Sequence, residues 1–280
     1  MMQGKIVAMT GATSGVGEKA VEAMARQGAR IVFVARDRTR ADATLSSLET
    51  LAPGLKHMAH LADLSLMREA KRVGAEIAAA EPRLDALVNN AGAMFSERRV
   101  TAEGLERTFA LNHMSYFMLT AGLIDRLKAA PEGRIVCTAS RAHRGAALDF
   151  DDLQSEKGYF SLRAYQRSKL ANVLFTRELA RRLSGSSVTA NCFHPGFVAS
   201  RFANEAGGLT ALLVSVAKRF ATSPENGADT LVYLLSSPEV AGVTGKYFAE
   251  RKVEVPSRAA CDDVAARRLW ETSEKLASSL

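Results

Sequence analysis

Thr10-Gly11-Ala12-Thr13-Ser14-Gly15-Val16-Gly17 follows the apolar run Lys5–Thr10 and leads directly into a helical pattern. Three glycines in this stretch let the backbone turn sharply and approach a pyrophosphate held at the N-terminus of the helix. The alternative is a glycine-rich turn that binds nothing, and the location directly after the first strand disfavours it. The segment therefore predicts a dinucleotide-binding turn. Its candidate binding residues are Gly11, Thr13, Ser14, Gly15, Val16 and Gly17.

Short apolar runs alternate with longer helical patterns along the chain, which is typical of βαβ units and a parallel sheet. Since no repeat or linker interrupts the pattern, we predict one Rossmann-type α/β domain over residues 1–280, with a doubly wound parallel sheet of about seven strands. The expected strands are Lys5–Thr10, Arg30–Ala35, Leu55–Leu61, Leu84–Asn89, Gly133–Ala139, Ser187–Cys192 and Lys246–Phe248. The expected helices lie near Gly15–Gln27, Arg38–Leu51, Ser65–Ala80, Thr101–Lys128 (two joined), Tyr159–Leu183, Ser223–Leu235 and Asp262–Ala277.

The composition disfavours several other classes of protein. The net charge is +7, but the basic residues are scattered in ones and twos and aromatic residues make up only 6%, so we expect no nucleic-acid interface. No apolar run is long enough to span a bilayer, and the N-terminus has no leader pattern. Cys137, Cys192 and Cys261 lie far apart, so we expect buried free thiols and a cytoplasmic protein.

The end of the second expected strand predicts which dinucleotide is bound. A carboxylate at this position would bind the adenosine ribose, but the chain has Ala35 there, followed by Arg36. A guanidinium beside an uncharged position favours a 2′-phosphate, which indicates NADP(H). The alternative is a surface arginine at a strand end. Asp37 comes one residue too late, and we expect it to face solvent or cap the next helix.

Tyr165-Gln166-Arg167-Ser168-Lys169 lies in a strongly helical stretch. A spacing of four residues places Tyr165 and Lys169 on the same face of a helix. Because a phenol is a poor base at neutral pH, a nearby ammonium that lowers its pKa would make it useful for proton transfer. The spacing alone is common in helices, so its meaning depends on the motifs around it.

Three further motifs accompany this pair. They are Asn89-Asn90-Ala91-Gly92 after the fourth expected strand, Leu111-Asn112-His113 in the following helices, and Ser140 after the fifth strand. The set resembles the short-chain dehydrogenase/reductases over nearly the whole chain. It looks closest to the retinol-dehydrogenase-like branch, which includes the protochlorophyllide reductases. That likeness comes from Tyr165–Asn172, His194-Pro195-Gly196 and Ala266-Arg267-Arg268-Leu269-Trp270-Glu271.

The resemblance implies four catalytic residues: Tyr165 exchanges a proton with the substrate oxygen, Lys169 binds the nicotinamide ribose and lowers the Tyr165 pKa, Ser140 donates to the carbonyl, and Asn112 supports a water relay to Lys169. It implies that Asp63, in Leu61-Ala62-Asp63-Leu64, lies beside the adenine, and that Pro195, Gly196 and Ser200 touch the nicotinamide. The full set expected to contact the cofactor beyond the glycine turn is Arg36, Asp63, Leu64, Asn89, Asn90, Ala91, Gly92, Tyr165, Lys169, Pro195, Gly196, Val198 and Ser200.

A few positions depart from the family pattern or invite another interpretation. Ser200 replaces the usual threonine, and Ser14 stands where many NADP-using members have a basic residue, so the 2′-phosphate argument depends mainly on Arg36. Cys137 replaces a common polar residue, and we expect it in the core. His113, His143 and His194 lack the spacing of metal ligands, so we expect no metal site.

The expected reaction is hydride transfer between NADP(H) and a ketone or aldehyde and its alcohol. Reduction of a carbon–carbon double bond and a non-catalytic dinucleotide sensor on the same fold stay open as alternatives. Loops near 140–158 and 196–224 are candidate walls of the substrate pocket. The expected partner is a small-molecule carbonyl or alcohol. The apolar run 209–216 favours a bulky hydrophobic substrate, although a lid helix packed on the core would look the same. Association with further copies of the chain also stays open.

Overall fold

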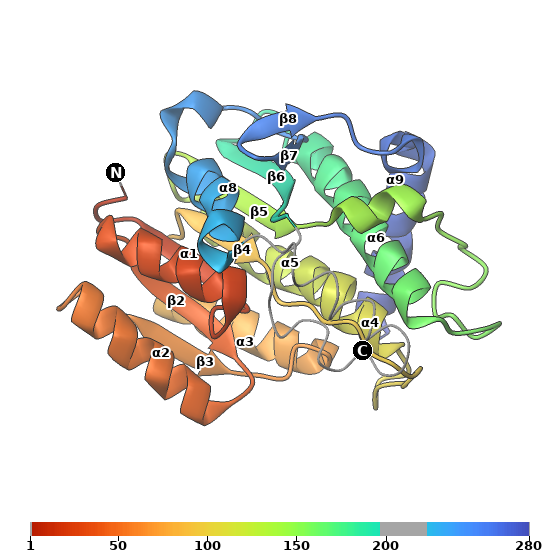
Figure 1. Ribbon diagram of the computed structural model, residues 1–280, viewed down its shortest axis with the longest axis horizontal. Coiled ribbons are helices and arrows are strands. Elements are labelled where there is room, and N and C mark those ends of the chain that lie inside the picture. The colour runs from red at the N-terminus through yellow and green to blue at the C-terminus, as the bar shows by residue number, and fades with distance from the viewer. Residues whose placement is uncertain (1, 197–222, 280) are drawn as a thin grey trace.

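Among the residues that the structure describes, 2–196 and 223–279, eight strands form one sheet in the order β3-β2-β1-β4-β5-β6-β7-β8. All neighbouring strands are parallel except β7 and β8. Figure 1 shows this computed structural model. The predicted doubly wound sheet is therefore confirmed, with eight strands in place of seven. The strands are β1 (Ile6–Thr10), β2 (Arg30–Ala35), β3 (Met58–Leu61), β4 (Ala86–Asn89), β5 (Gly133–Thr138), β6 (Val188–His194), β7 (Tyr247–Ala249) and β8 (Lys252–Glu254).

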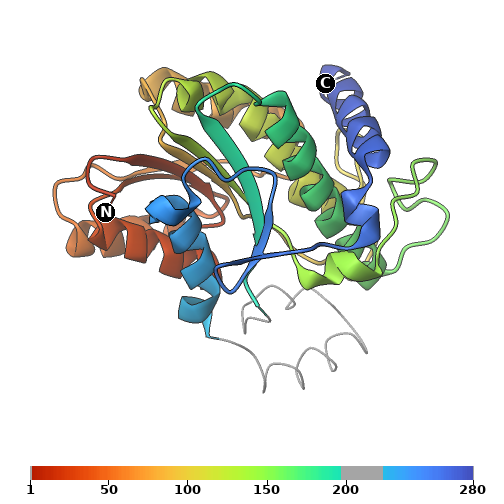
Figure 2. The same ribbon diagram turned by 90° about the horizontal axis from the view of Figure 1, so that it is seen from above.

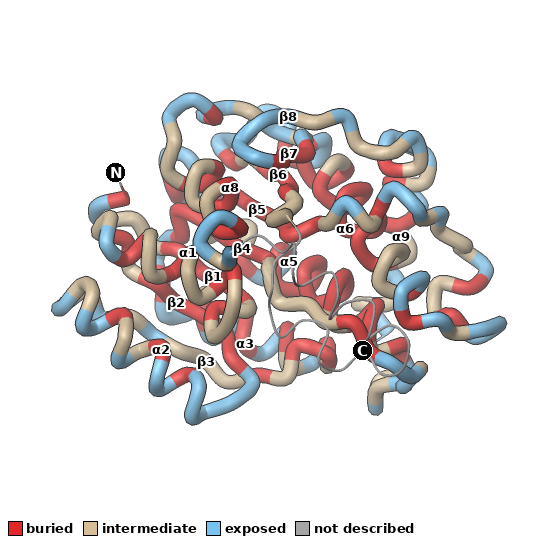
Figure 3. The backbone as a smooth tube through the Cα atoms, in the orientation of Figure 1, coloured by how far each residue is buried: buried red, intermediate tan, exposed pale blue. Residues whose placement is uncertain are grey.

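Helices cover both faces of the sheet, and each face has its own apolar core (Figure 2). Helices α1, α2 and α8 pack on one face, and α3, α5, α6 and α9 pack on the other. Every residue of β4 and β5 is buried, as expected of central strands that are covered on both sides (Figure 3). The helices are α1 (Gly15–Arg26), α2 (Arg38–Leu51), α3 (Met67–Ala80), α4 (Arg107–Phe109), α5 (Ser115–Lys128), α6 (Ser161–Arg182), α8 (Pro224–Ser236) and α9 (Asp263–Ser278).

The eighth strand, β8, is not among the strands that the sequence predicts. It pairs with β7 through a tight turn at Glu250 and Arg251, whose φ angles are 50° and 61°. Left-handed backbone at two residues other than glycine or asparagine is uncommon, so the usual hairpin signal is missing from the sequence. A strand of three residues is also too short to show a period.

Two helices begin later than predicted because side chains cap them from unexpected places. The helix expected from Thr101 begins at Arg107, where the Glu106 carboxylate accepts hydrogen bonds from two backbone N–H groups of the first turn. The helix expected from Ser65 begins at Met67, and its N-terminus is capped by Glu103, which is distant in sequence. A carboxylate at a helix N-terminus satisfies unpaired N–H groups and complements the helix dipole.

The cysteines and the apolar segments match the sequence analysis only in part. Cys137 and Cys192 are buried free thiols as expected, and burial raises the pKa of Cys137 to about 11, whereas Cys261 is exposed. Cys261 is the last residue of a short 3₁₀ helix, Arg258–Cys261, that lies just before α9 and outside the sheet, which explains the difference. None of the described helices is both long and apolar enough to cross a bilayer.

Candidate functional site

The site lies at the carboxyl ends of β1 and β4, where the strand order changes direction. In open α/β sheets this topological switch is where ligands bind. Thr10 at the end of β1 holds the two strand ends together, because its hydroxyl oxygen accepts hydrogen bonds from the backbone N–H groups of Asn90 and Ala91, both at 2.9 Å. Sequence reasoning missed this role, since a threonine at a strand end has many alternative uses.

The glycine turn requires glycine for steric reasons. A Cβ on Gly17 would lie 1.9 Å from the carbonyl oxygen of Gly11, and a Cβ on Gly11 would lie 2.8 Å from the Asn90 amide nitrogen. Gly11 also has a φ of 69°, in the left-handed region. The turn thus brings its own backbone into close contact and presents the N-terminus of α1. This cradle fits a dinucleotide pyrophosphate.

The other expected residues of the turn lie where a cofactor could reach them. Thr13, Ser14 and Gly15 are partly exposed, and Ser14 precedes α1 without a side-chain capping bond. Val16 is buried, so it contributes apolar packing and its backbone. The side chains of Thr13 and Ser14 are therefore open to a ligand, while Val16 packs in the core beside α1.

The end of β2 places an uncharged residue beside an exposed guanidinium. Ala35 is buried, and Arg36 is exposed and pairs with none of the other described residues. Asp37 caps α2, because its carboxylate accepts from the backbone N–H of Arg40 at 2.9 Å. The prediction for Asp37 is thus correct, and the charge left at the strand end is the Arg36 guanidinium.

Asp63 and Leu64 follow β3, the edge strand beside β2. One carboxylate oxygen of Asp63 accepts from the backbone N–H and the hydroxyl of Ser65, at 3.0 and 2.8 Å. Leu64 is buried in the core. Asp63 is partly exposed, so its second oxygen stays available at the strand end, which suits contact with an adenine edge.

Asn89 and Asn90 separate into two different roles. The Asn89 side chain is fully buried and donates to the Thr120 hydroxyl at 3.0 Å, so it fixes α5 beneath the sheet, and its contact with a cofactor stays a prediction. Asn90 donates to the Gly11 carbonyl at 3.1 Å and accepts from the Thr138 hydroxyl at 2.9 Å. Asn90 therefore braces the glycine turn. Ala91 and Gly92 continue from it and are partly exposed.

Asn112 lies in a π-helical turn, Ala110–Met114, that joins α4 to α5. Its side-chain amide pairs with the backbone of Ala93 in both directions, each at 2.9 Å, and also donates to the Ser168 hydroxyl at 2.9 Å. Asn112 thus anchors the segment after β4 to α6. Asn112 and Lys169 both lie close to Gly92. A Cβ added at Gly92 would lie 3.2 Å from the side-chain oxygen of Asn112 and 3.4 Å from the Lys169 amine.

Ser140, Tyr165 and Lys169 come together from β5 and α6. The side chains of Ser140 and Tyr165 are hydrogen-bonded to each other. The Lys169 amine lies 5.6 Å from the centre of the Tyr165 ring. Lys169 is buried and donates to the Thr138 carbonyl at 3.0 Å. Four residues of helix place both side chains on the face of α6 that meets the end of β5.

The protonation states of this group follow from burial. Burial raises the pKa of Tyr165 to about 12, and the hydrogen bond with Ser140 acts in the opposite direction. This differs from the expected lowering of the Tyr165 pKa, because in the protein alone desolvation of the phenolate is the largest effect. Burial also lowers the pKa of Lys169 to about 8. At neutral pH the phenol therefore keeps its proton and the lysine carries its charge.

Pro195 and Gly196 follow β6 and are partly exposed, with Gly196 at a φ of 83°. Val198, Ser200 and the apolar run 209–216 lie outside the described residues, as does most of the loop 196–224. Among the described residues, no cluster of three metal-ligating side chains occurs. His113 and His143 are buried and hydrogen-bonded to Ser273 and to the Ser140 carbonyl, respectively.

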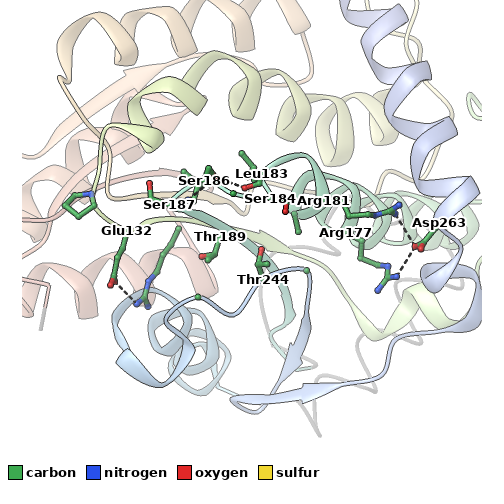
Figure 4. A pocket seen from close by; sticks show the side chains of 18 residues that line it. Glu132, Arg177, Arg181, Leu183, Ser184, Ser186, Ser187, Thr189, Thr244 and Asp263 are labelled. Carbon is green, nitrogen blue, oxygen red and sulfur yellow. Dashed lines mark hydrogen bonds and ion pairs between the residues drawn. The ribbon is translucent and has the colours of Figure 1, made fainter.

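A groove of about 950 Å³ lies at the opposite ends of β5 and β6 (Figure 4). Its cationic side chains are already paired, since Arg177 and Arg181 both donate to Asp263, at 3.0 and 3.1 Å. The groove is lined at the start of β5 by Gly133 and at the start of β6 by Val188, so it is separate from the site at the carboxyl ends.

The fold and the switch-point site define a dinucleotide-binding protein of the Rossmann type. Residues 5–208 match the family model for short chain dehydrogenases. Retinol dehydrogenase 14 of Homo sapiens is 39% identical over 298 residues, covering 100% of this chain and 88% of that protein. Retinol dehydrogenase 13 of Homo sapiens is 39% identical over 281 residues, covering 98% and 84%. The chain therefore belongs to the short-chain dehydrogenase/reductase family, in its retinol-dehydrogenase-like branch, and is an oxidoreductase.

Solved structures agree with this assignment. An uncharacterized protein from Mycobacterium paratuberculosis superposes with a TM-score of 0.79 at 28% identity, covering 99% of this chain and 94% of that one. The RhlG/NADP complex of Pseudomonas aeruginosa superposes with a TM-score of 0.71 at 26% identity, covering 92% and 97%.

Proposed function

We propose that the protein interconverts a ketone or aldehyde and its alcohol with NADP(H), and that Tyr165 is the general acid and base. The observation that carries the proposal is the cluster of Ser140, Tyr165 and Lys169 beside the glycine turn. When bound, a nicotinamide dinucleotide supplies or accepts the hydride. The residues of the chain bind the reactants, orient them and move the proton.

In the direction of reduction, the carbonyl oxygen is placed by a hydrogen bond from Ser140. The O–H bond of Tyr165 breaks and its proton goes to that oxygen as the carbonyl carbon receives the hydride. A phenol with a pKa near 12 holds its proton at neutral pH, which is the form that an acid needs. Oxidation of the alcohol requires the phenolate, so its rate should rise with pH.

The preference for NADP(H) is supported by Arg36 and Ala35. Arg36 is exposed and pairs with none of the described residues, so its guanidinium is available to a 2′-phosphate. The NADP complex of the Pseudomonas aeruginosa relative is consistent with this choice. We expect NADPH to be favoured over NADH by roughly ten- to a few hundredfold in kcat/KM, because a charge-assisted hydrogen bond contributes roughly 1.5–3 kcal/mol.

Steady-state kinetics with both cofactors test the preference. Ala35→Asp combined with Arg36→Ile should invert it by adding a ribose acceptor and removing the phosphate partner. The wild-type preference should shrink at high salt, since the contact is exposed. A wild type that prefers NADH, or a double variant with an unchanged ratio, would show that Arg36 is only a surface residue.

We further propose a lipophilic substrate, which the relatives named as retinol dehydrogenases support. Replacing part of the run 209–216 by glycine and serine should then raise KM more for large apolar carbonyls than for small ones, since each buried methylene contributes about 0.8 kcal/mol.

Product analysis separates carbonyl reduction from reduction of a double bond. Turnover of NADPH with any carbonyl separates an enzyme from a dinucleotide sensor.

A reducing compartment such as the cytoplasm is also part of the proposal. Cys137 and Cys192 are register partners on β5 and β6, and both are free thiols. Unpaired neighbouring cysteines suit a compartment in which thiols stay reduced. Localisation of the tagged protein by fluorescence in its native cell tests this, and secretion would contradict it.

A further inference from the structure

The residues that follow Ser140 are bonded to a segment more than a hundred positions further along the chain. They form a short 3₁₀ helix, Arg141–Gly145. Arg141 and Arg144 both donate to the Glu254 carboxylate on β8, at 3.1 and 3.4 Å, and Arg144 also donates to the Val255 carbonyl at 2.7 Å. The loop that carries Ser140 is therefore held against the end of the sheet.

His143 is the buried member of this contact. Its Nδ1 lies 2.6 Å from the Ser140 carbonyl oxygen, and its Nε2 lies 3.1 Å from the backbone nitrogen of Ser257. A backbone N–H can only donate, so Nε2 accepts and the ring proton is on Nδ1. Nδ1–H then donates to the Ser140 carbonyl. Burial lowers the pKa of His143, which keeps the ring in this neutral form.

The hydroxyl of Ser140 depends on the same short helix. Its oxygen accepts from the backbone N–H of Ala142 at 3.2 Å, and its carbonyl accepts from the backbone N–H of His143 at 3.1 Å. The ring of His143 also lies edge-on against Tyr247, with centroids 5.0 Å apart. Ser140 is thus fixed at its backbone by His143, while its side chain reaches Tyr165.

We propose that His143 is a positioning residue for the reaction: it donates to the Ser140 carbonyl, and the Ser257 N–H selects the ring tautomer that can do so. The inference rests on the proposed function, because it concerns the serine that orients the substrate oxygen. Small displacements of an orienting group are costly, since a shift of about 1 Å can reduce a rate by up to roughly a hundredfold.

Two variants separate the role of the hydrogen bond from simple packing. His143→Leu removes both hydrogen bonds of the ring, to Ser140 and to Ser257. His143→Asn keeps a donor at the position of Nδ1 but cannot reach Ser257. The matched control is His57→Leu. The Nδ1 of His57 accepts from the backbone N–H of Ile31 at 3.0 Å, near the start of β2 and far from the site.

We expect His143→Leu to lower kcat roughly tenfold with little change in KM for NADPH, and His143→Asn to stay within about threefold of the wild type. His57→Leu should lower stability without lowering kcat. The proposal is overturned if folded His143→Leu keeps its kcat, if His143→Asn is no better than His143→Leu, or if His57→Leu loses kcat equally.

Hydrogen exchange measures the same bond without turnover. Peptides covering residues 140–146 should exchange faster in cofactor-free His143→Leu than in the wild type, and His143→Asn and His57→Leu should leave them unchanged. Unchanged exchange in His143→Leu overturns the inference. A wild type with this protection but no NADPH turnover would instead refute the proposed function alone.

Discussion

Replacing Lys169 by methionine should lower turnover sharply and yet stabilise the cofactor-free protein at neutral pH. Lys169 is 2% exposed, and its ammonium makes a hydrogen bond to the Thr138 carbonyl. Methionine keeps the length and most of the volume of the side chain but carries no charge. The Thr138 carbonyl keeps a second donor in the variant, because Asn172 also donates to it at 3.2 Å. The substitution therefore removes a buried charge without leaving that carbonyl unpaired.

The size of the effect follows from the pKa of Lys169. Burial lowers it from 10.5 to about 8, which corresponds to a cost of roughly 3 kcal/mol for holding the ammonium in the folded protein. Below pH 8 the lysine is protonated in both states, so the whole cost applies. Between about pH 8 and 10.5 only the unfolded chain binds the proton, so the wild type becomes more stable as pH rises. The advantage of Lys169→Met should therefore be largest at or below pH 8 and shrink toward pH 10.5.

Urea unfolding of the cofactor-free proteins at several pH values measures this difference. Lys71→Met, at an exposed position of α3, is the control and should change stability little at any pH. In assays of residual activity, Lys169→Met should bind NADPH more weakly and show an alkaline limb at higher pH. A variant less stable than the wild type at pH 7, or a stability difference that does not change with pH, would refute the assignment of a desolvated ammonium.

Three further substitutions test other parts of the site. Tyr165→Phe should lower kcat by about 10²–10⁴-fold and leave NADPH binding nearly intact by fluorescence titration, since only the ionisable oxygen is lost; activity within about fivefold of the wild type would exclude Tyr165 as the acid. Gly17→Ala should abolish NADPH binding, because its Cβ would lie 1.9 Å from the Gly11 carbonyl, whereas Gly74→Ala in α3, with no neighbour nearer than 3.8 Å, should be tolerated. Thr10→Val should lower the free energy of unfolding by about 2–4 kcal/mol in urea titrations, because two N–H groups lose their acceptor, and Thr10→Ser should restore it.

Local patterns in the sequence predict the parts of the site that depend on local geometry. The four-residue spacing of Tyr165 and Lys169 places them on one face of α6, and the position of Ser140 after β5 brings it to the same end of the sheet. The positions of Ala35 and Arg36 at the end of β2 follow from the length of one βα unit. In each case a single element, or the rule that parallel strands end at one edge, determines where the residue lies.

Asn89 and Asn90 show what the geometry of a strand adds to the motif. Consecutive residues of a strand point to opposite faces, so Asn89 and Asn90 could not both face the glycine turn. Asn89 is the last residue of β4 and points to Thr120, and Asn90 reaches Gly11. The alternation of the strand is sufficient to predict that only one of the two side chains braces the glycine turn.

His143 and β8 could not be predicted in this way, because their contacts join segments distant in the chain. The strand has three residues and follows a turn of Glu250 and Arg251, neither of which signals a left-handed backbone. Without β8 there is no reason to expect Glu254 beside Arg141 and Arg144, or the Ser257 N–H beside His143. A histidine with no metal-ligand spacing then looks like a core residue. Its hydrogen bond to the Ser140 carbonyl gives it a place in the site that only the fold reveals.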